Sequence, residues 1–192
     1  MITSHVALKE WAVVVEALAS GDHLLLLRKG GIQDPKGIFQ LEHREFLLYP
    51  TLEHQEQGMV RSPFRERFQQ AFAEPADLTQ VPFRVYGGVA FCGQVRSASQ
   101  LAGLERYHIW RPEFLEERMK YRPQAPTLLV LVRAYRLSLP MLRPVKPEHA
   151  GCKSWVKLDE PVPVEGAQPV VENRRFREVL EEVAARVDMA AL

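Results

Sequence analysis

The chain has 192 residues, of which 46% are hydrophobic and 26% are charged, and its formal net charge is +1 at pH 7. This length predicts one domain with one sizeable core, and the composition is that of an ordinary globular protein. No apolar run approaches the roughly 18 residues of a membrane span and no basic-then-apolar leader is evident, so we expect a cytoplasmic protein that does not engage a membrane.

The two cysteines, Cys92 and Cys152, lie in different segments and give no reason to expect a disulfide framework. Charge is unevenly spread: residues 61–136 carry twelve Lys and Arg against seven Asp and Glu, whereas residues 1–60 carry five against eight. A basic patch of this kind attracts nucleic-acid phosphates. The alternative is that these arginines pair with the acidic flanks in the fold.

The first predicted element is a helix that begins at Thr3 or Ser4 and ends at Gly21. Glu10 projects from the border of its apolar face, where a carboxylate is either an edge residue or a site residue. The apolar face has helical spacing and consists of Ala7, Leu8, Trp11, Val14, Val15 and Leu18.

Strands and short helices alternate after this helix. Four consecutive leucines in residues 24–29 predict a central strand buried on both faces, and residues 46–49 predict a second strand closed by Pro50. Residues 63–72 are typical of an amphipathic helix, and residues 82–92 of a strand with a bulge or bend at Gly87 and Gly88. Short helices are expected near residues 97–104 and 112–119.

The strongest strand pattern covers residues 127–137. A rigid, irregular loop is expected at residues 140–147, a strand at 153–158 and a helix at about 172–187. Because the strands are not regularly separated by crossover helices, we predict a single α+β domain over residues 1–192. Its sheet should be mixed or mostly antiparallel and bent, or a partly closed barrel, with the N-terminal and C-terminal helices packed outside.

Arg28, Lys29, Gly30 and Gly31 form the first candidate site. Glycines at the end of a strand let backbone N–H groups converge on an anion, and the two cations add charge-assisted hydrogen bonds. The spacing is not that of a nucleotide-binding loop. A tight turn flanked by solvated charges explains the same residues.

The second candidate contains Thr51, His54 and Gln55, close to His43 and Glu53. Imidazole can act as an acid, a base or a metal ligand. No recognised metal spacing is present, so neither a metal nor another cofactor is expected. Alternatively, Thr51 caps a helix and Gln55 completes that turn.

The third candidate is an extended segment in which Lys153, Trp155 and Lys157 share one face. An indole between two ammonium groups can stack a base while the lysines hold phosphates. The alternative is an exposed edge whose Trp is covered by lysine stems. Cys152 would need a nearby base or cation to be a nucleophile, and Lys153 points to the opposite face.

Trp110 and Arg111 offer further stacking and phosphate contacts, although a helix cap before Pro112 accounts for them structurally.

Four sets of residues form a pattern along the chain: 7–11 (ALKEW), 26–32 (LLRKGGI), 46–51 (FLLYPT) with 54–55 (HQ), and 151–155 (GCKSW). Together they resemble a known bacterial family, the domain of unknown function 1802. The resemblance implies similarity over most of the chain but no established activity. Some similar regions stand beside restriction-endonuclease-like domains, which implies a role in DNA defence or processing.

Three hypotheses follow. The favoured one is a nucleic-acid-associated binding module for DNA or RNA, in which Trp110 or Trp155 stacks a base. Its phosphate contacts would come from Arg28, Lys29, Arg111, Lys153 and Lys157.

The second hypothesis is a small enzyme acting on a phosphorylated or nucleotide substrate, with Glu10 and His54 as general acid and base and Arg28 and Lys29 as an anion clamp. The third is a protein-interaction subunit that uses its terminal helix, and the sequence leaves the oligomeric state open.

Overall fold

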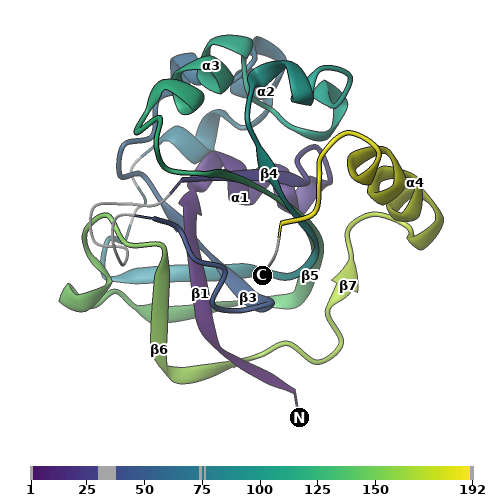
Figure 1. Ribbon diagram of the computed structural model, residues 1–192. Coiled ribbons are helices and arrows are strands. Elements are labelled where there is room, and N and C mark those ends of the chain that lie inside the picture. Colours follow the sequence, from purple (N-terminus) through teal and green to yellow (C-terminus); the bar gives the residue numbers. More distant parts are fainter. Residues whose placement is uncertain (1, 30–37, 74, 76, 191–192) are drawn as a thin grey trace.

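Seven strands form one mixed sheet in the computed structural model, which describes residues 2–29, 38–73, 75 and 77–190 (Figure 1). The strand order is β2-β5-β4-β3-β1-β6, with β7 paired to β5. The pair β1 and β3 is parallel, and the other pairs are antiparallel. The predicted α+β class and mixed sheet are therefore confirmed, and the sheet is open rather than closed into a barrel. The strands are β1 (Thr3–Trp11), β2 (Leu25–Arg28), β3 (Glu45–Thr51), β4 (Gln80–Val95), β5 (Thr127–Pro144), β6 (Trp155–Pro163) and β7 (Gln168–Pro169).

Four α-helices accompany the sheet in the described residues: α1 (Ala12–Ser20), α2 (Ser62–Arg67), α3 (Pro112–Lys120) and α4 (Asn173–Ala184). Helices α1, α2 and α3 gather on one side, and α4 packs at a flank against β4 and β5 (Figure 1). Single 3-10 turns occur at Gln57–Met59, Gln69–Phe72, Ala98–Leu101, Glu105–Tyr107 and Pro147–His149. Among the described residues, no helix has both the length and the apolarity to cross a bilayer.

The predicted N-terminal helix is wrong in its first half, because Thr3–Trp11 is the strand β1. This strand lies between β3 and β6 and has both faces covered, so Ala7, Leu8 and Lys9 are buried in succession. Such continuous burial produces an apolar run that imitates helical spacing. The helix starts only at Ala12 and ends, as predicted, at Gly21, whose φ of 82° suits glycine.

Other boundaries also shift. Strand β2 is buried as expected but lies at the end of the sheet order rather than in its centre. Strand β5 continues to Pro144 through the predicted loop. In β4 the register shifts between Phe83 and Val85 and between Val89 and Phe91, not at the glycines. Gly87 instead permits close packing, since a Cβ there would lie 2.8 Å from Cγ1 of Val132.

The two faces of the sheet bury two separate apolar clusters. Alternate residues of β3 show this: Phe46 and Leu48 belong to the larger cluster, whereas Leu47 and Tyr49 belong to the smaller one. The same alternation in β1 sends neighbouring side chains to opposite faces. Lys9 therefore lies on the Tyr49 face, and Glu10 lies on the face that carries the larger cluster.

Candidate functional site

The three polar segments singled out from the sequence meet around the C-terminal end of β1. A nitrogen of the Arg28 guanidinium, Nη2, donates to Oγ of Ser154 at 2.8 Å. The backbone N–H of Gly151 donates to Oε1 of Glu53 at 3.2 Å, and Nε2 of His54 lies 3.2 Å from Sγ of Cys152. Contacts between residues about 100 positions apart therefore assemble one polar region from three short sequences.

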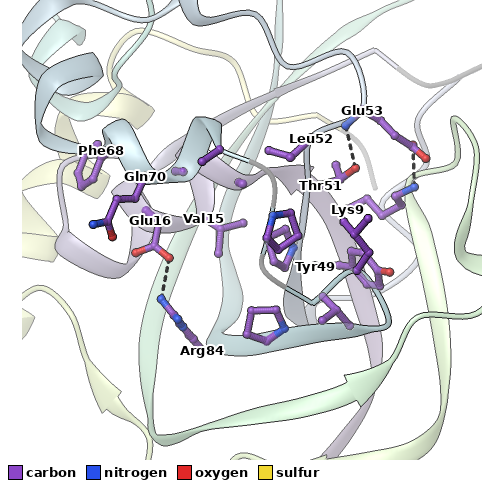
Figure 2. Close-up of a pocket in the computed structure, with 18 of the residues that line it drawn as sticks. Lys9, Val15, Glu16, Tyr49, Thr51, Leu52, Glu53, Phe68, Gln70 and Arg84 are labelled. Atoms are coloured by element: carbon purple, nitrogen blue, oxygen red, sulfur yellow. Dashed lines mark hydrogen bonds and ion pairs between the residues drawn. The ribbon is translucent and has the colours of Figure 1, made fainter.

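Lys9, which was not singled out from the sequence, ties two of these segments together. Its Nζ is buried and donates to Oε2 of Glu53 at 2.9 Å and to the carbonyl oxygens of His149 and Gly151, each at 3.0 Å. Figure 2 shows the Lys9–Glu53 pair above the ring of Tyr49. Burial raises the pKa of Glu53, but the hydrogen bond and charge of Lys9, helped by the Gly151 amide, outweigh it and lower that pKa.

An open cleft of about 870 Å³ lies beside Lys9, on the Tyr49 face of the sheet (Figure 2). Strands β1, β3 and β4, helix α1 and the segment around Phe68 all contribute to its wall. Its polar and aromatic lining includes Lys9, Glu16, Tyr49, Thr51, Glu53, Arg67, Phe68, Gln69, Gln70, Gln80, Arg84 and His149. None of Lys9, Tyr49 or His149 was assigned to a site from the sequence, because their convergence depends on the sheet.

His149 stands at one end of this cleft in a positive environment. Burial lowers the pKa of its imidazole, and the charges of Lys153, Lys146 and Lys9 lower it further, against the opposing charge of Glu148. Lys153 forms no ion pair with any described residue, whereas Lys146 pairs with Glu148 and Asp159. Lys153, whose charge acts on His149 in the cleft lining, is therefore free to meet an anion.

On the opposite face, Glu10 and Arg28 form an ion pair of 2.5 Å between Oε1 and Nη1. Lys29 is buried, and its Nζ donates to the carbonyl oxygens of Met119 and Tyr121 at 2.8 and 2.5 Å. The predicted anion clamp of Arg28 and Lys29 is thus engaged within the protein. Gly30 and Gly31 lie outside the described residues.

The predicted acid and base are not brought together by any contact among the described residues. Glu10 is held by Arg28, while His54 faces Cys152. His54 has a φ of 56°, which is uncommon for a residue other than glycine. Its imidazole nevertheless lies beside Cys152, a contact that reasoning from neighbouring residues had not predicted.

The side chains of Thr51 and Gln55 form hydrogen bonds to the backbone of the protein. Oγ1 of Thr51 accepts the backbone N–H of Glu53 at 3.1 Å, while the Thr51 side chain also lines the cleft. Oε1 of Gln55 accepts the N–H of Val13 at 3.0 Å, and its Nε2 donates to the carbonyl of Ala71 at 3.0 Å. Gln55 therefore joins the start of α1 to the segment after α2.

The predicted stacking residues differ in access. Trp110 is buried and stacks on Phe114 with ring centroids 4.1 Å apart, so no base can reach its ring in this structure. Trp155 is half-buried against Phe39 and Phe46, and its Nε1 donates to the carbonyl of Gln40 at 2.8 Å.

The remaining predicted cations are more accessible. Arg111 is 42% exposed and pairs with Glu113 at 3.0 Å. Lys157 is exposed two residues after Trp155, on the face of the sheet away from the cleft. Lys153, by contrast, acts on His149 at the cleft, so the three residues of the predicted Trp155 platform serve two different faces.

Within the described ranges, no three side chains of His, Cys, Asp or Glu are arranged to hold a metal ion. The chemistry on offer is hydrogen bonding in the cleft, a free ammonium group at its end, and a thiol beside an imidazole.

Comparison with solved structures finds a loose resemblance to the ASCH protein from Zymomonas mobilis. The match has 11% sequence identity and a TM-score of 0.42, and it covers 93% of this chain and 94% of that one. Two single-residue mutants of the same protein match with 10% and 8% identity and TM-scores of 0.42 and 0.40, covering 94% and 92% of this chain and 99% and 96% of theirs. No curated protein sequence matches significantly.

A family model also matches, and it spans residues 7–182 and so covers β1 through most of α4. The match includes every described segment that converges on the end of β1. The chain belongs to the family described as domain of unknown function (DUF1802).

Proposed function

We propose that this protein is a nucleic-acid-associated binding module whose cleft receives one unstacked nucleotide of a single-stranded DNA or RNA. The observation that supports the proposal is a lysine without an ion pair among the described residues, Lys153, whose charge acts on His149 in the lining of a cleft of about 870 Å³. Cavities of roughly 300 to 1,000 Å³ are typical of small-molecule sites. A base and its sugar fall in that class.

The cleft itself suits an uncharged group. Its cations are each paired with a carboxylate: Lys9 with Glu53 at 2.9 Å, Arg67 with Asp22 at 2.8 Å, and Arg84 with Glu16 at 3.1 Å. Figure 2 shows the first and last of these pairs within the wall. A base edge can bind between such pairs without breaking them, whereas a phosphate would have to displace a carboxylate.

Neutral hydrogen-bonding groups complete the lining. The side-chain amides of Gln69, Gln70 and Gln80 offer both donors and acceptors, which is what the edge of a base requires. The half-buried ring of Phe68 lies in the same wall and provides a surface for stacking. Recognition of the base and attraction of the phosphate are thus carried by different residues.

Outside the cleft, Lys153 would contact a phosphate of the nucleic acid. Its ammonium group is unpaired among the described residues and already acts on His149. Lys157 is the comparison, because it is an exposed lysine of the same segment but lies on the other face, whereas Lys153 is half-buried. The two lysines therefore separate a cleft-centred surface from one centred on Trp155.

The test is fluorescence anisotropy with labelled single- and double-stranded DNA and RNA at low and moderate salt. We expect single strands to bind with a strong salt dependence. Lys153→Ala should reduce the slope of log K against log salt by about 0.7, as for loss of one phosphate contact in a single strand. Lys157→Ala should leave the slope unchanged. Absence of binding to all four nucleic acids, or equal effects of the two substitutions, would refute the proposal.

The His54–Cys152 contact favours a second candidate, a small enzyme that acts on a nucleotide-like substrate through a thiol nucleophile. In this arrangement His54 accepts the proton of Cys152, and the carboxylate of Glu53 lies close enough to interact with the imidazole charge. Trapping of a covalent intermediate on Cys152, absent in Cys152→Ser, would select this candidate. Binding that is unaffected by the same substitution would select the binding module.

A further inference from the structure

Positive charge is concentrated beneath α3, on the face of the sheet away from the cleft. The charge of Arg118 in α3 acts on Lys29, and Arg28 at the end of β2 acts on Arg118, as does the carboxylate of Glu10. Among the described residues, Glu10 is therefore the carboxylate that Arg28 and Arg118 share. Partly buried ions without compensation are costly, so the excess calls for an additional anion or strong acceptors.

Two of the three cations already have such partners. Arg28 pairs with Glu10 and donates to Ser154 and to the carbonyl of Lys9. The ammonium group of Lys29 is held by two backbone carbonyls at the end of α3. Arg118 is therefore the cation whose positive charge is least compensated.

Arg118 has very few acceptors for its five N–H groups. Within the described residues, its one hydrogen bond is a long contact of 3.4 Å from Nη2 to the carbonyl of Leu27. The Nε atoms of Arg118 and Arg28 are both buried, and neither has a hydrogen-bond partner among the described residues. Burial lowers the pKa of Arg118, and the charge of Arg28 lowers it further.

A small cavity of about 50 Å³ opens between these two guanidinium groups. Glu10, Arg28 and Arg118 form its polar wall, while Trp11, Trp110 and Phe114 form much of its apolar wall. A single water needs roughly 10 to 15 Å³ on this measure, so the cavity is large enough for a small anionic group. It is too small for a nucleotide.

We propose that this cavity is a binding site for a small oxyanion, a carboxylate or a phosphate group, held between Arg118 and Arg28. A guanidinium presents parallel N–H donors that match the oxygens of either group. The bound oxyanion supplies acceptors for Arg118 and offsets the excess positive charge. The apolar rings exclude water from it and restrict its size.

The site is independent of the nucleic-acid proposal, because the cleft lies on the Tyr49 face and this cavity on the Glu10 face. Glu10 occupies part of the polar wall, but its charge is already compensated by Arg28 at 2.5 Å. The oxyanion therefore competes with Glu10 for Arg28, whereas at Arg118 the one hydrogen bond it meets among the described residues is the long contact to the carbonyl of Leu27.

The experiment is isothermal titration calorimetry of the full chain with inorganic phosphate and, separately, with acetate, at a constant ionic strength set with sodium chloride. We expect saturable binding of at least one of them, and at least a tenfold weaker affinity in Arg118→Gln. The control is Lys120→Gln, which removes the same charge from the same helix at a side chain that is 77% exposed. It should bind as the unaltered protein does.

Arg118→Lys provides a second variant that keeps the charge but loses the fork of donors, and we expect it too to bind more weakly. A preference for phosphate or for acetate identifies the natural group as a phosphate or a carboxylate. The proposal is overturned if neither anion binds, or if Arg118→Gln and Lys120→Gln bind equally well.

Discussion

Two buried histidines should make this fold sensitive to mild acid. His23 follows α1 and is completely buried, and its Nδ1 accepts the backbone N–H of Ile109 at 3.2 Å. Burial lowers the pKa of His23 to about 3, with smaller effects from the charges of His108 and Arg61. Burial also lowers the pKa of His108 to about 4, assisted by Arg61 and opposed by Glu105.

The sign and size of the effect follow from these values. Both imidazoles stay neutral in the folded protein, whereas in the unfolded chain they take up a proton near the ordinary pKa of 6.5. Their contribution to stability is therefore present above pH 6.5 and is lost as the pH falls toward 4 for His108 and toward 3 for His23. Lowering the pH from about 6.5 to about 5 removes roughly 2 kcal/mol per histidine, or roughly 4 kcal/mol together.

Urea unfolding at pH 7.5 and at pH 5 measures this loss. The double substitution His23→Gln and His108→Gln should abolish most of the difference between the two pH values, even where it lowers stability at pH 7.5. His5→Gln is the control, because His5 is exposed and its replacement should leave the difference between the two pH values unchanged. The reasoning is refuted if the double variant keeps the full difference, or if NMR shows the imidazoles of His23 and His108 titrating near pH 6.5.

Three further outcomes can be measured. Gln55→Leu should lower the free energy of unfolding by about 1 to 3 kcal/mol, because it leaves the N–H of Val13 in α1 without its acceptor. Gln55→Glu keeps an acceptor and should lower the free energy of unfolding less. Urea denaturation of the two variants measures the difference. Gly87→Ala should lower the free energy of unfolding by about 1 to 3 kcal/mol by overpacking, whereas Gly88→Ala has open space around its Cβ and should lower it much less. Equal decreases in the melting temperature of the two variants would contradict this. Iodoacetamide should alkylate Cys152 well before Cys92, since Cys92 is buried and burial raises the pKa of its thiol; peptide mass mapping that shows equal rates would count against it.

Local patterns predicted the elements whose environment is simple. The amphipathic stripe that includes Phe176, Val179 and Val183 gave the terminal helix to within a few residues, because one face packs and the other is solvated. The apolar run at residues 127–137 predicted a strand, and most of these residues are buried in β5. Residues 3–11 misled because burial on both faces of β1 removes the alternation that marks a strand.

Site residues were predictable as residue types but not as an arrangement. The polar segments containing Arg28, His54 and Cys152 were identified because reactive residues follow apolar runs. Their convergence depends on β1 pairing with both β3 and β6, which no local pattern encodes. Lys9 was missed for that reason, since it gains its role only from segments distant in the chain.

The position of β1 has a consequence for biosynthesis. This strand precedes the other strands of the sheet in the chain, yet its partner on one edge, β6, begins only at Trp155. Until that residue leaves the ribosome, the edge of β1 carries unpaired backbone groups that can recruit another strand, including one from a neighbouring nascent chain. Completion of the sheet must wait for the synthesis of β6, so folding should be slowed by this long loop closure.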